Sequence, residues 1–289
     1  MPSHIFARLG LWQEDIQANL ASLHAAQGPA AHVGAENQLH AMEFLEYAYL
    51  QMGEDSKANA MVEGQRKIAY DQVDPNLHDY VDRTRANSPA MYFLETRNWK
   101  AAEELKPDPH AAPYNQAITF WAHAIAAGHL DHLAAAKEAI EQYDAMLEAT
   151  KKGPRAFVAN KMETQRDEAH AWLLFLEGKG NAATESLRKI AERQDVVGKG
   201  EVELPGREML ADMLLKMNRP ADALAEFEKS LKTDPKRFNG LYGAGRAAEL
   251  VGERDKEWRY YAQLMNNCAT SQSQRPELAH ASESIRAAR

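Results

Sequence analysis

The chain contains a single cysteine, Cys268, among its 289 residues. An intramolecular disulfide is therefore excluded, and so is a zinc module built from several cysteine ligands. No apolar run reaches the length that a helix needs to cross a membrane. The N-terminus also lacks the charged segment and the apolar segment of a signal peptide. These absences favour a cytoplasmic protein that has no membrane partner.

Dense positive charge is missing as well. The net charge is −8 at pH 7, and Lys151 and Lys152 form only an isolated basic pair. Binding to the phosphate backbone of a nucleic acid requires a strongly cationic face. We therefore expect no nucleic acid among the partners of this protein.

Alternating runs of Val, Ile and Thr, which are typical of strands, are almost absent. The residues are 45% hydrophobic and 26% charged, which is the composition of a folded chain. Alanine is abundant, while Gly and Pro fall between apolar runs rather than within them. The sequence therefore predicts an all-α protein.

Residue types recur with a period of 34 residues near the C-terminus. The repeating pairs are Ala211 and Gly245, Asn218 and Gly252, Phe227 and Tyr261, and Leu231 and Met265. A period of this length is typical of stacked helical hairpins.

These positions resemble the tetratricopeptide repeat (TPR) family. In that family a small residue lies in the first helix, Gly or Asn in the turn, Ala and an aromatic residue in the second helix, and Pro at the end. The matching residues are Ala211, Asn218, Ala223, Phe227 and Pro235. The resemblance implies a right-handed α-solenoid of about seven hairpins with a C-terminal cap helix. We expect residues 1–289 to form this solenoid as a single domain.

Turn residues mark the expected hairpins along the chain. The predicted helix pairs are 3–9 with 12–26, 36–52 with 55–69, 89–97 with 99–105, 114–127 with 131–149, 156–177 with 181–193, 206–217 with 220–233, and 238–251 with 254–267, followed by the cap helix at 277–289. The repeats are degenerate over 1–193 and clearest over 205–267. Segments 71–88 and 194–205 are predicted linkers.

Two N-terminal segments, MPSHIFARLGLW (1–12) and FLEYAYLQMG (44–53), resemble a group of bacterial TPR proteins. The segments PGREMLADML (205–214) and RFNGLYGAGRAAEL (237–250) are similar to the same group. In that group further repeats precede the first segment, so this chain resembles either the C-terminal half of a longer protein or a short version of it. A shortened first hairpin is expected to expose Ile5, Phe6 and Leu9 and to associate with another chain or with upstream repeats.

No catalytic motif is complete. The tetrapeptide DEAH (167–170) lacks the GxxxxGK[ST] loop that a helicase requires, and no GxSxG turn is present. Cys268 has no activating base near it in the sequence. The glycines Gly240, Gly243 and Gly245 miss the GxGxxG spacing and are expected to allow close helix packing instead. The sequence therefore favours a scaffold without catalysis and without a cofactor.

Four tryptophans lie in apolar helical contexts and are expected in the core, namely Trp12, Trp99, Trp121 and Trp258. Polar and aromatic residues on the first helix of each hairpin are expected to line a concave groove that binds a protein or peptide. The predicted groove residues are His40, Glu43, Tyr47, Tyr92, Trp172, Glu208, Asp212, Tyr242 and Arg246. Glu208 and Asp212 against Arg246 form either an ordinary salt bridge between helices or a charged clamp for a ligand.

An alternative is a metal- or small-molecule-binding protein, or even an enzyme. The candidate ligands His4, His40, His123 and His170 all fall on predicted first helices. Together with Glu43, one turn from His40, they offer nitrogen and carboxylate donors for a metal ion. The competing interpretation is that each histidine forms hydrogen bonds within the stack or faces water.

Overall fold

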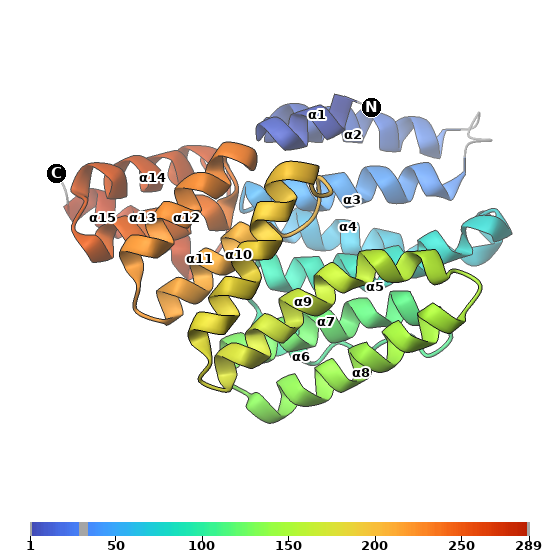
Figure 1. Cartoon of the computed structure of the whole chain (residues 1–289). Coiled ribbons are helices and arrows are strands. Elements are labelled where there is room, and N and C mark those ends of the chain that lie inside the picture. Colours follow the sequence, from blue (N-terminus) through green and yellow to red (C-terminus); the bar gives the residue numbers. More distant parts are fainter. Residues whose placement is uncertain (1, 29–33, 288–289) are drawn as a thin grey trace. The chain divides into compact units, whose positions relative to one another are not determined.

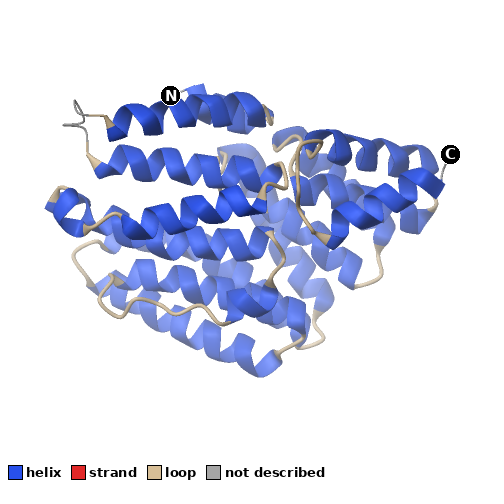
Figure 2. Ribbon diagram, turned by 180° about the vertical axis from the view of Figure 1, so that it is seen from behind, coloured by secondary structure: helices blue, strands red, loops and turns tan. Residues whose placement is uncertain are grey.

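The structure is a computed structural model that describes residues 2–28 and 34–287. These residues fold entirely into helices and loops, and no strand occurs among them (Figure 2). The prediction of an all-α protein is therefore confirmed. None of the described helices combines the length and the apolar character needed to cross a bilayer.

Fifteen α-helices and three 3-10 helices make up the described chain (Figure 1). They are α1 (Pro2–Leu9), α2 (Trp12–Gln27), α3 (Ala35–Gln51), α4 (Asp55–Lys67), η1 (Tyr70–Gln72), η2 (Pro75–Leu77), α5 (His78–Glu95), α6 (Trp99–Glu103), α7 (Pro113–Leu130), α8 (Leu133–Lys152), η3 (Ala156–Val158), α9 (Ala159–Leu176), α10 (Gly180–Val197), α11 (Gly206–Lys216), α12 (Pro220–Thr233), α13 (Phe238–Val251), α14 (Arg254–Asn267) and α15 (Pro276–Ala287). Most of them begin and end close to the predicted positions.

The predicted linker 71–88 is wrong in its second half, because α5 already begins at His78. Asp74 starts this region by accepting a hydrogen bond of 2.8 Å from the backbone N–H of Asn76. Pro89, which we interpreted as a helix start, lies inside α5. An internal proline costs a helix about 3 kcal/mol. Burial of the inner face of α5, including Val81, outweighs that cost.

The chain divides into two compact units. The first unit contains Met1–His24, Ala41–Met61 and Ala191–Arg289, and the second contains Ala25–His40 and Val62–Ile190. The single domain, the right-handed stacking and the number of repeats remain predictions.

In the first unit, each helix from α11 to α14 packs against the helix that follows it (Figure 1). Glycines on α13 make this packing possible. A Cβ atom on Gly243 would lie 2.1 Å from the Phe227 ring, and one on Gly245 would lie 2.4 Å from the Tyr261 ring. Both aromatic side chains are fully buried. The predicted role of these glycines in close helix packing is therefore confirmed.

The N-terminal helices of the first unit also contact its C-terminal repeats. Trp12 Nε1 donates a hydrogen bond of 2.9 Å to the carbonyl of Lys236. The backbone N–H of Phe238 donates one of 2.9 Å to Gln51 Oε1. In a simple solenoid each repeat contacts only its neighbours in sequence. The first unit departs from that rule, because segments far apart in the chain pack together within it.

In the second unit, α7 is the central helix and packs against α5, α6, α8 and α9. It is rich in alanine, which allows other helices to approach closely. A Cβ atom on Gly128 would lie 2.5 Å from the Trp172 ring, which is fully buried. Trp121 Nε1 donates a hydrogen bond of 2.9 Å to Glu168 Oε2 across α7 and α9.

Candidate functional site

The first unit presents a row of neighbouring helices made of α11, α13 and α15, since α11 contacts α13 and α13 contacts α15. Three of the predicted groove residues lie half-buried on α11 and α13, namely Asp212, Tyr242 and Arg246. Asp212 and Arg246 stand one repeat apart. Their partial exposure leaves polar and aromatic atoms on the surface of this row.

Glu249, one turn after Arg246 on α13, is the centre of the polar contacts in this row. Its carboxylate accepts hydrogen bonds from Tyr261 Oη at 2.9 Å and from His280 Nε2 at 2.8 Å. Arg246 Nη1 lies 2.9 Å from Glu249 Oε1. Burial of the carboxyl opposes ionisation, but the three donors outweigh it and hold the pKa of Glu249 below its ordinary value. Glu249 is therefore an anion at neutral pH.

Three rings surround this carboxylate. The ring centroids of Tyr242, Tyr261 and His280 lie between 5.8 and 6.1 Å apart. Burial and the adjacent Glu249 carboxylate raise the pKa of Tyr261 far above its ordinary value, so the hydroxyl stays a donor. The cluster combines aromatic area with one acidic and two basic groups. The sequence analysis missed Glu249 and His280. Two spacings could have identified them: Glu249 lies one turn after Arg246, and His280 follows Arg246 by one repeat of 34 residues.

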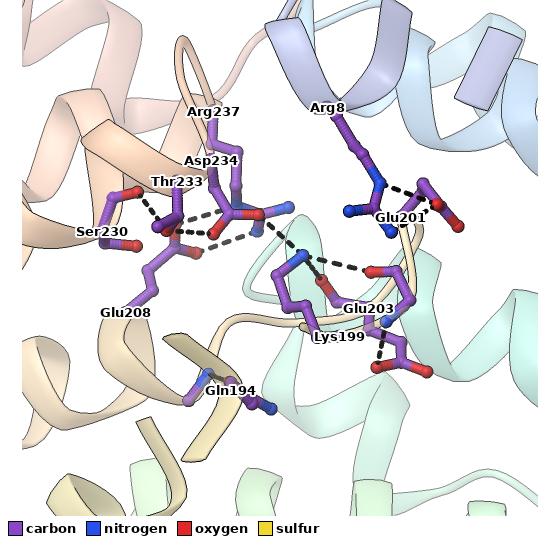
Figure 3. A network of polar contacts seen from close by, with 12 residues as sticks. Arg8, Gln194, Lys199, Glu201, Glu203, Glu208, Ser230, Thr233, Asp234 and Arg237 are labelled. Atoms are coloured by element: carbon purple, nitrogen blue, oxygen red, sulfur yellow. Dashed lines mark hydrogen bonds and ion pairs between the residues drawn. The ribbon is translucent and has the colours of Figure 1, made fainter. Parts of the chain in front are cut away.

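Glu208 does not pair with Arg246. Its carboxylate accepts two hydrogen bonds of 2.9 Å from Arg237, through Nε and Nη2 (Figure 3). Arg237 also donates a hydrogen bond to the hydroxyl of Tyr47. The central carbon of its guanidinium group lies 5.4 Å from the centroid of the Tyr47 ring. All three side chains are buried. Glu208 and Tyr47 therefore belong to the core of the first unit and not to an open groove.

The other predicted groove residues also vary in exposure. Glu43, on α3, is only 6% exposed. His40, Tyr92 and Trp172 belong to the second unit; His40 and Tyr92 are half-buried, whereas Trp172 is fully buried. The large ring of Trp172 packs against Gly128, which explains its burial. Of the nine predicted residues, Asp212, Tyr242 and Arg246 are the ones that are half-buried on the row of α11, α13 and α15.

Three of the four histidines proposed as metal ligands have separate contacts. His4 Nδ1 lies 3.5 Å from Glu201 Oε2, His123 Nε2 lies 2.9 Å from the carbonyl of Leu105, and His170 Nε2 lies 3.6 Å from Asp144 Oδ2. Burial lowers the pKa of His123 below its ordinary value. Nowhere in residues 2–28 and 34–287 do three His, Cys, Asp or Glu side chains gather where they could hold a metal ion.

A polar pocket of about 250 Å³ lies in the first unit, between α1, the end of α10, and the end of α12. The loop after α10 lines it, and ion pairs hold this loop in place (Figure 3). Lys199 Nζ lies 2.7 Å from Asp234 Oδ1, and Arg8 Nη2 lies 2.7 Å from Glu201 Oε1. The first part of the predicted linker 194–205 is helical, because α10 extends to Val197. The rest is a loop that these ion pairs hold against α1 and the end of α12.

The pocket is balanced in charge. Arg207, which is 6% exposed, forms ion pairs with both Asp195 and Glu226. Burial opposes the ionisation of Glu226, but Lys229 and Arg207 outweigh it and lower the pKa of this carboxyl. Each basic side chain that lines the pocket thus already has an acidic partner. This network stabilises the junction of the loop with α11 and α12.

Cys268 has none of the features of a catalytic thiol. It is 5% exposed, and burial raises its pKa to about 12. The thiol is therefore protonated at neutral pH and is a poor nucleophile.

The prediction that four tryptophans lie in the core is wrong for Trp258. Trp258 is 50% exposed and Trp99 is half-buried, whereas Trp12 and Trp121 are each 3% exposed. Trp258 lies on α14, and no following hairpin covers it among the described residues.

No protein-family model matches the chain, and no curated protein matches it. The geometry of the two units is therefore the basis for the functional proposal.

Proposed function

We propose that this chain is a TPR-type scaffold that binds a segment of another protein and performs no chemistry itself. The binding surface would be the row formed by α11, α13 and α15 in the first unit. The residues that offer contacts are Asp212, Tyr242, Arg246, Glu249 and His280.

One observation carries the proposal. The row presents half-buried polar and aromatic side chains on neighbouring first helices of successive hairpins, and its residues repeat with the period of the hairpins. The side chains of Arg246 and His280 are 36% and 35% exposed. Interfaces of proteins are enriched in Tyr and Arg, which supply area together with directional hydrogen bonds. Such a surface suits an extended or helical peptide segment.

The alternative of a metal-binding or catalytic protein receives less support. Its candidate residues His4, His123 and His170 each have separate contacts, as described above. A ligand that bridges them would have to break these contacts. Elemental analysis of protein purified without chelator tests this alternative directly.

The test of the peptide-binding proposal is photo-crosslinking in cells. A photoreactive phenylalanine analogue replaces Tyr242 in one variant and Phe157, which is 71% exposed on the second unit, in a control. We expect a defined protein to be crosslinked at position 242 and not at position 157. Titration of a peptide from that protein should then give weaker binding with Arg246→Ala. If no protein is captured and a metabolite raises the melting temperature instead, the proposal is wrong.

We also infer self-association through α1. Ile5 and Leu9, one turn apart, are 60% and 54% exposed, and Phe6 is half-buried. Exposed apolar side chains on one helix face favour contact with a second copy. Light scattering coupled to size-exclusion chromatography should show a dimer or larger species, and Ile5→Ser with Leu9→Ser should reduce it to a monomer. A monomeric wild-type chain at high concentration would refute this inference.

A further inference from the structure

The most exposed tryptophan of the first unit lies where the repeat pattern places a buried residue. Trp258 on α14 stands 34 residues after Leu224 on α12. Leu224 is 4% exposed, but Trp258 is 50% exposed. The equivalent aromatic residues Phe227 and Tyr261, also 34 positions apart, do not differ in exposure, because both are fully buried. Leu224 must therefore be covered by a part of the chain that has no counterpart over Trp258.

The cover over Leu224 is the next hairpin. Glu228 lies one turn after Leu224, so the two share one flank of α12. On that flank, Tyr260 Oη donates a hydrogen bond of 2.8 Å to Glu228, and Lys256 Nζ lies 3.1 Å from the same oxygen. Side chains of α14 therefore reach the flank of α12 that contains Leu224.

Trp258 lies on the opposite flank of α14. Residues two positions apart on an α-helix point about 200° apart. Lys256 and Tyr260 contact α12, so Trp258, midway between them in sequence, points away from α12. Helix α15 packs on α13 and α14 and leaves this flank open.

The open flank has a defined chemistry. Ala262 and Met265 lie one and two turns after Trp258 on α14, and each is half-buried. At one end of this apolar stripe lies Arg254, whose side chain is 79% exposed and whose ion pair with Glu257 is 3.3 Å long. The equivalent residue on α12 is Pro220, so the repeat pattern does not require a charge here.

We propose that this flank of α14 binds an amphipathic helix of a partner protein. The partner helix packs against this open flank of α14. It carries an apolar stripe that covers Trp258 and an acidic residue near one end that pairs with Arg254. This surface is distinct from the row of α11, α13 and α15, so the two proposals can fail separately.

The test uses two synthetic helical peptides and the full chain. Both peptides have the same leucine stripe, and one carries glutamate where the other carries lysine. Fluorescence anisotropy should show tighter binding of the glutamate peptide, weakened by salt. Trp258→Ala should reduce the affinity about tenfold or more, as expected for a central aromatic contact. Arg254→Glu should reverse the preference, so that the lysine peptide binds more tightly.

Control variants separate this surface from others. Phe157→Ala removes an even more exposed aromatic side chain from the second unit and should leave binding unchanged. Tyr242→Ala should also leave it unchanged. Equal binding of both peptides, no binding of either peptide, or wild-type affinity in Trp258→Ala would overturn the proposal. A dimer in sedimentation experiments that Trp258→Ala dissociates would overturn it as well, because the occupant would then be a second copy.

Discussion

Arg237 donates two hydrogen bonds of 2.9 Å to the carboxylate of Glu208, and both side chains are almost completely buried. The pair connects the start of α13 with α11 inside the first unit. Removing an ionic group from water is costly, and a buried pair repays that cost only while both partners are present. The pair is therefore a point at which a single substitution should have a large effect.

We predict that Arg237→Met destabilises the chain by about 3–5 kcal/mol, because it leaves Glu208 buried without its counter-charge. The double variant Arg237→Met with Glu208→Leu should be more stable than Arg237→Met alone. Urea denaturation followed by circular dichroism measures both. Additive effects of the two substitutions would contradict the coupling that the geometry indicates.

Asp15 on α2 is the second unusual buried charge. It is fully buried, and its only hydrogen-bond donor among the described side chains is Asn19, at 2.8 Å. Burial raises the pKa of Asp15 to about 7, while the hydrogen bond from Asn19 acts in the opposite direction. In the unfolded chain this carboxyl ionises at about pH 4.

The folded pKa of Asp15 is raised, so ionisation of Asp15 weakens the folded state. The free energy of unfolding should fall as the pH rises from about 4 to about 7, with no further change from this group above that range. Asp15→Asn should abolish this loss, and the variant should exceed the wild type in stability at pH 8. Thermal unfolding over this pH range tests it, with Glu14→Gln on the exposed side of α2 as the control. Parallel profiles for Asp15→Asn and the wild type would show that Asp15 is not responsible.

The 34-residue pattern predicted the fold of α11 to α14 because it reports packing between neighbours. Phe227 and Tyr261 are buried as expected, and the glycines beside them have the expected role. Such contacts depend on residues close in sequence, so periodicity records them. The limits of α5 were missed because Pro89 is tolerated inside a helix whose inner face is buried.

The candidate site was predicted only in part, for a related reason. We predicted Glu208 as a groove residue because it lies on the first helix of its hairpin, one turn before Asp212. Its actual partners are Arg237 and, through that arginine, Tyr47, which lies 190 residues away from Arg237 in the chain. No local pattern encodes a contact of that separation. Arg246, by contrast, pairs with Glu249 on the same helix, and Tyr242 has ring neighbours on α14 and α15, which follow α13 in the chain.

Because Gly243 packs against Phe227, we predict that replacing this glycine by alanine lowers the stability of the fold, although the same change in an exposed helix usually raises it. In an open helix, replacing Gly by Ala stabilises by about 1 kcal/mol. Here the new Cβ would lie 2.1 Å from the Phe227 ring, so Gly243→Ala should destabilise the first unit. Adding Phe227→Leu should recover part of the loss, because the smaller side chain leaves room. A gain in melting temperature from Gly243→Ala alone would contradict the close approach of α13 and α12.

The contact between Glu249 and His280 predicts how firmly α15 is attached. Among the described residues of α15, Ala281 is the only fully buried apolar side chain, so polar contacts contribute much of its attachment. The pKa of Glu249 is lowered in the folded chain, so its stabilising effect is present above the unfolded pKa and is lost as the pH falls through the folded pKa. Glu249→Gln should remove this pH dependence and speed amide hydrogen exchange in α15 at neutral pH, with α12 unchanged. Ser282→Ala, on the same helix, serves as the control. Equal protection of α15 in Glu249→Gln and the wild type at pH 7 would show that other contacts hold this helix.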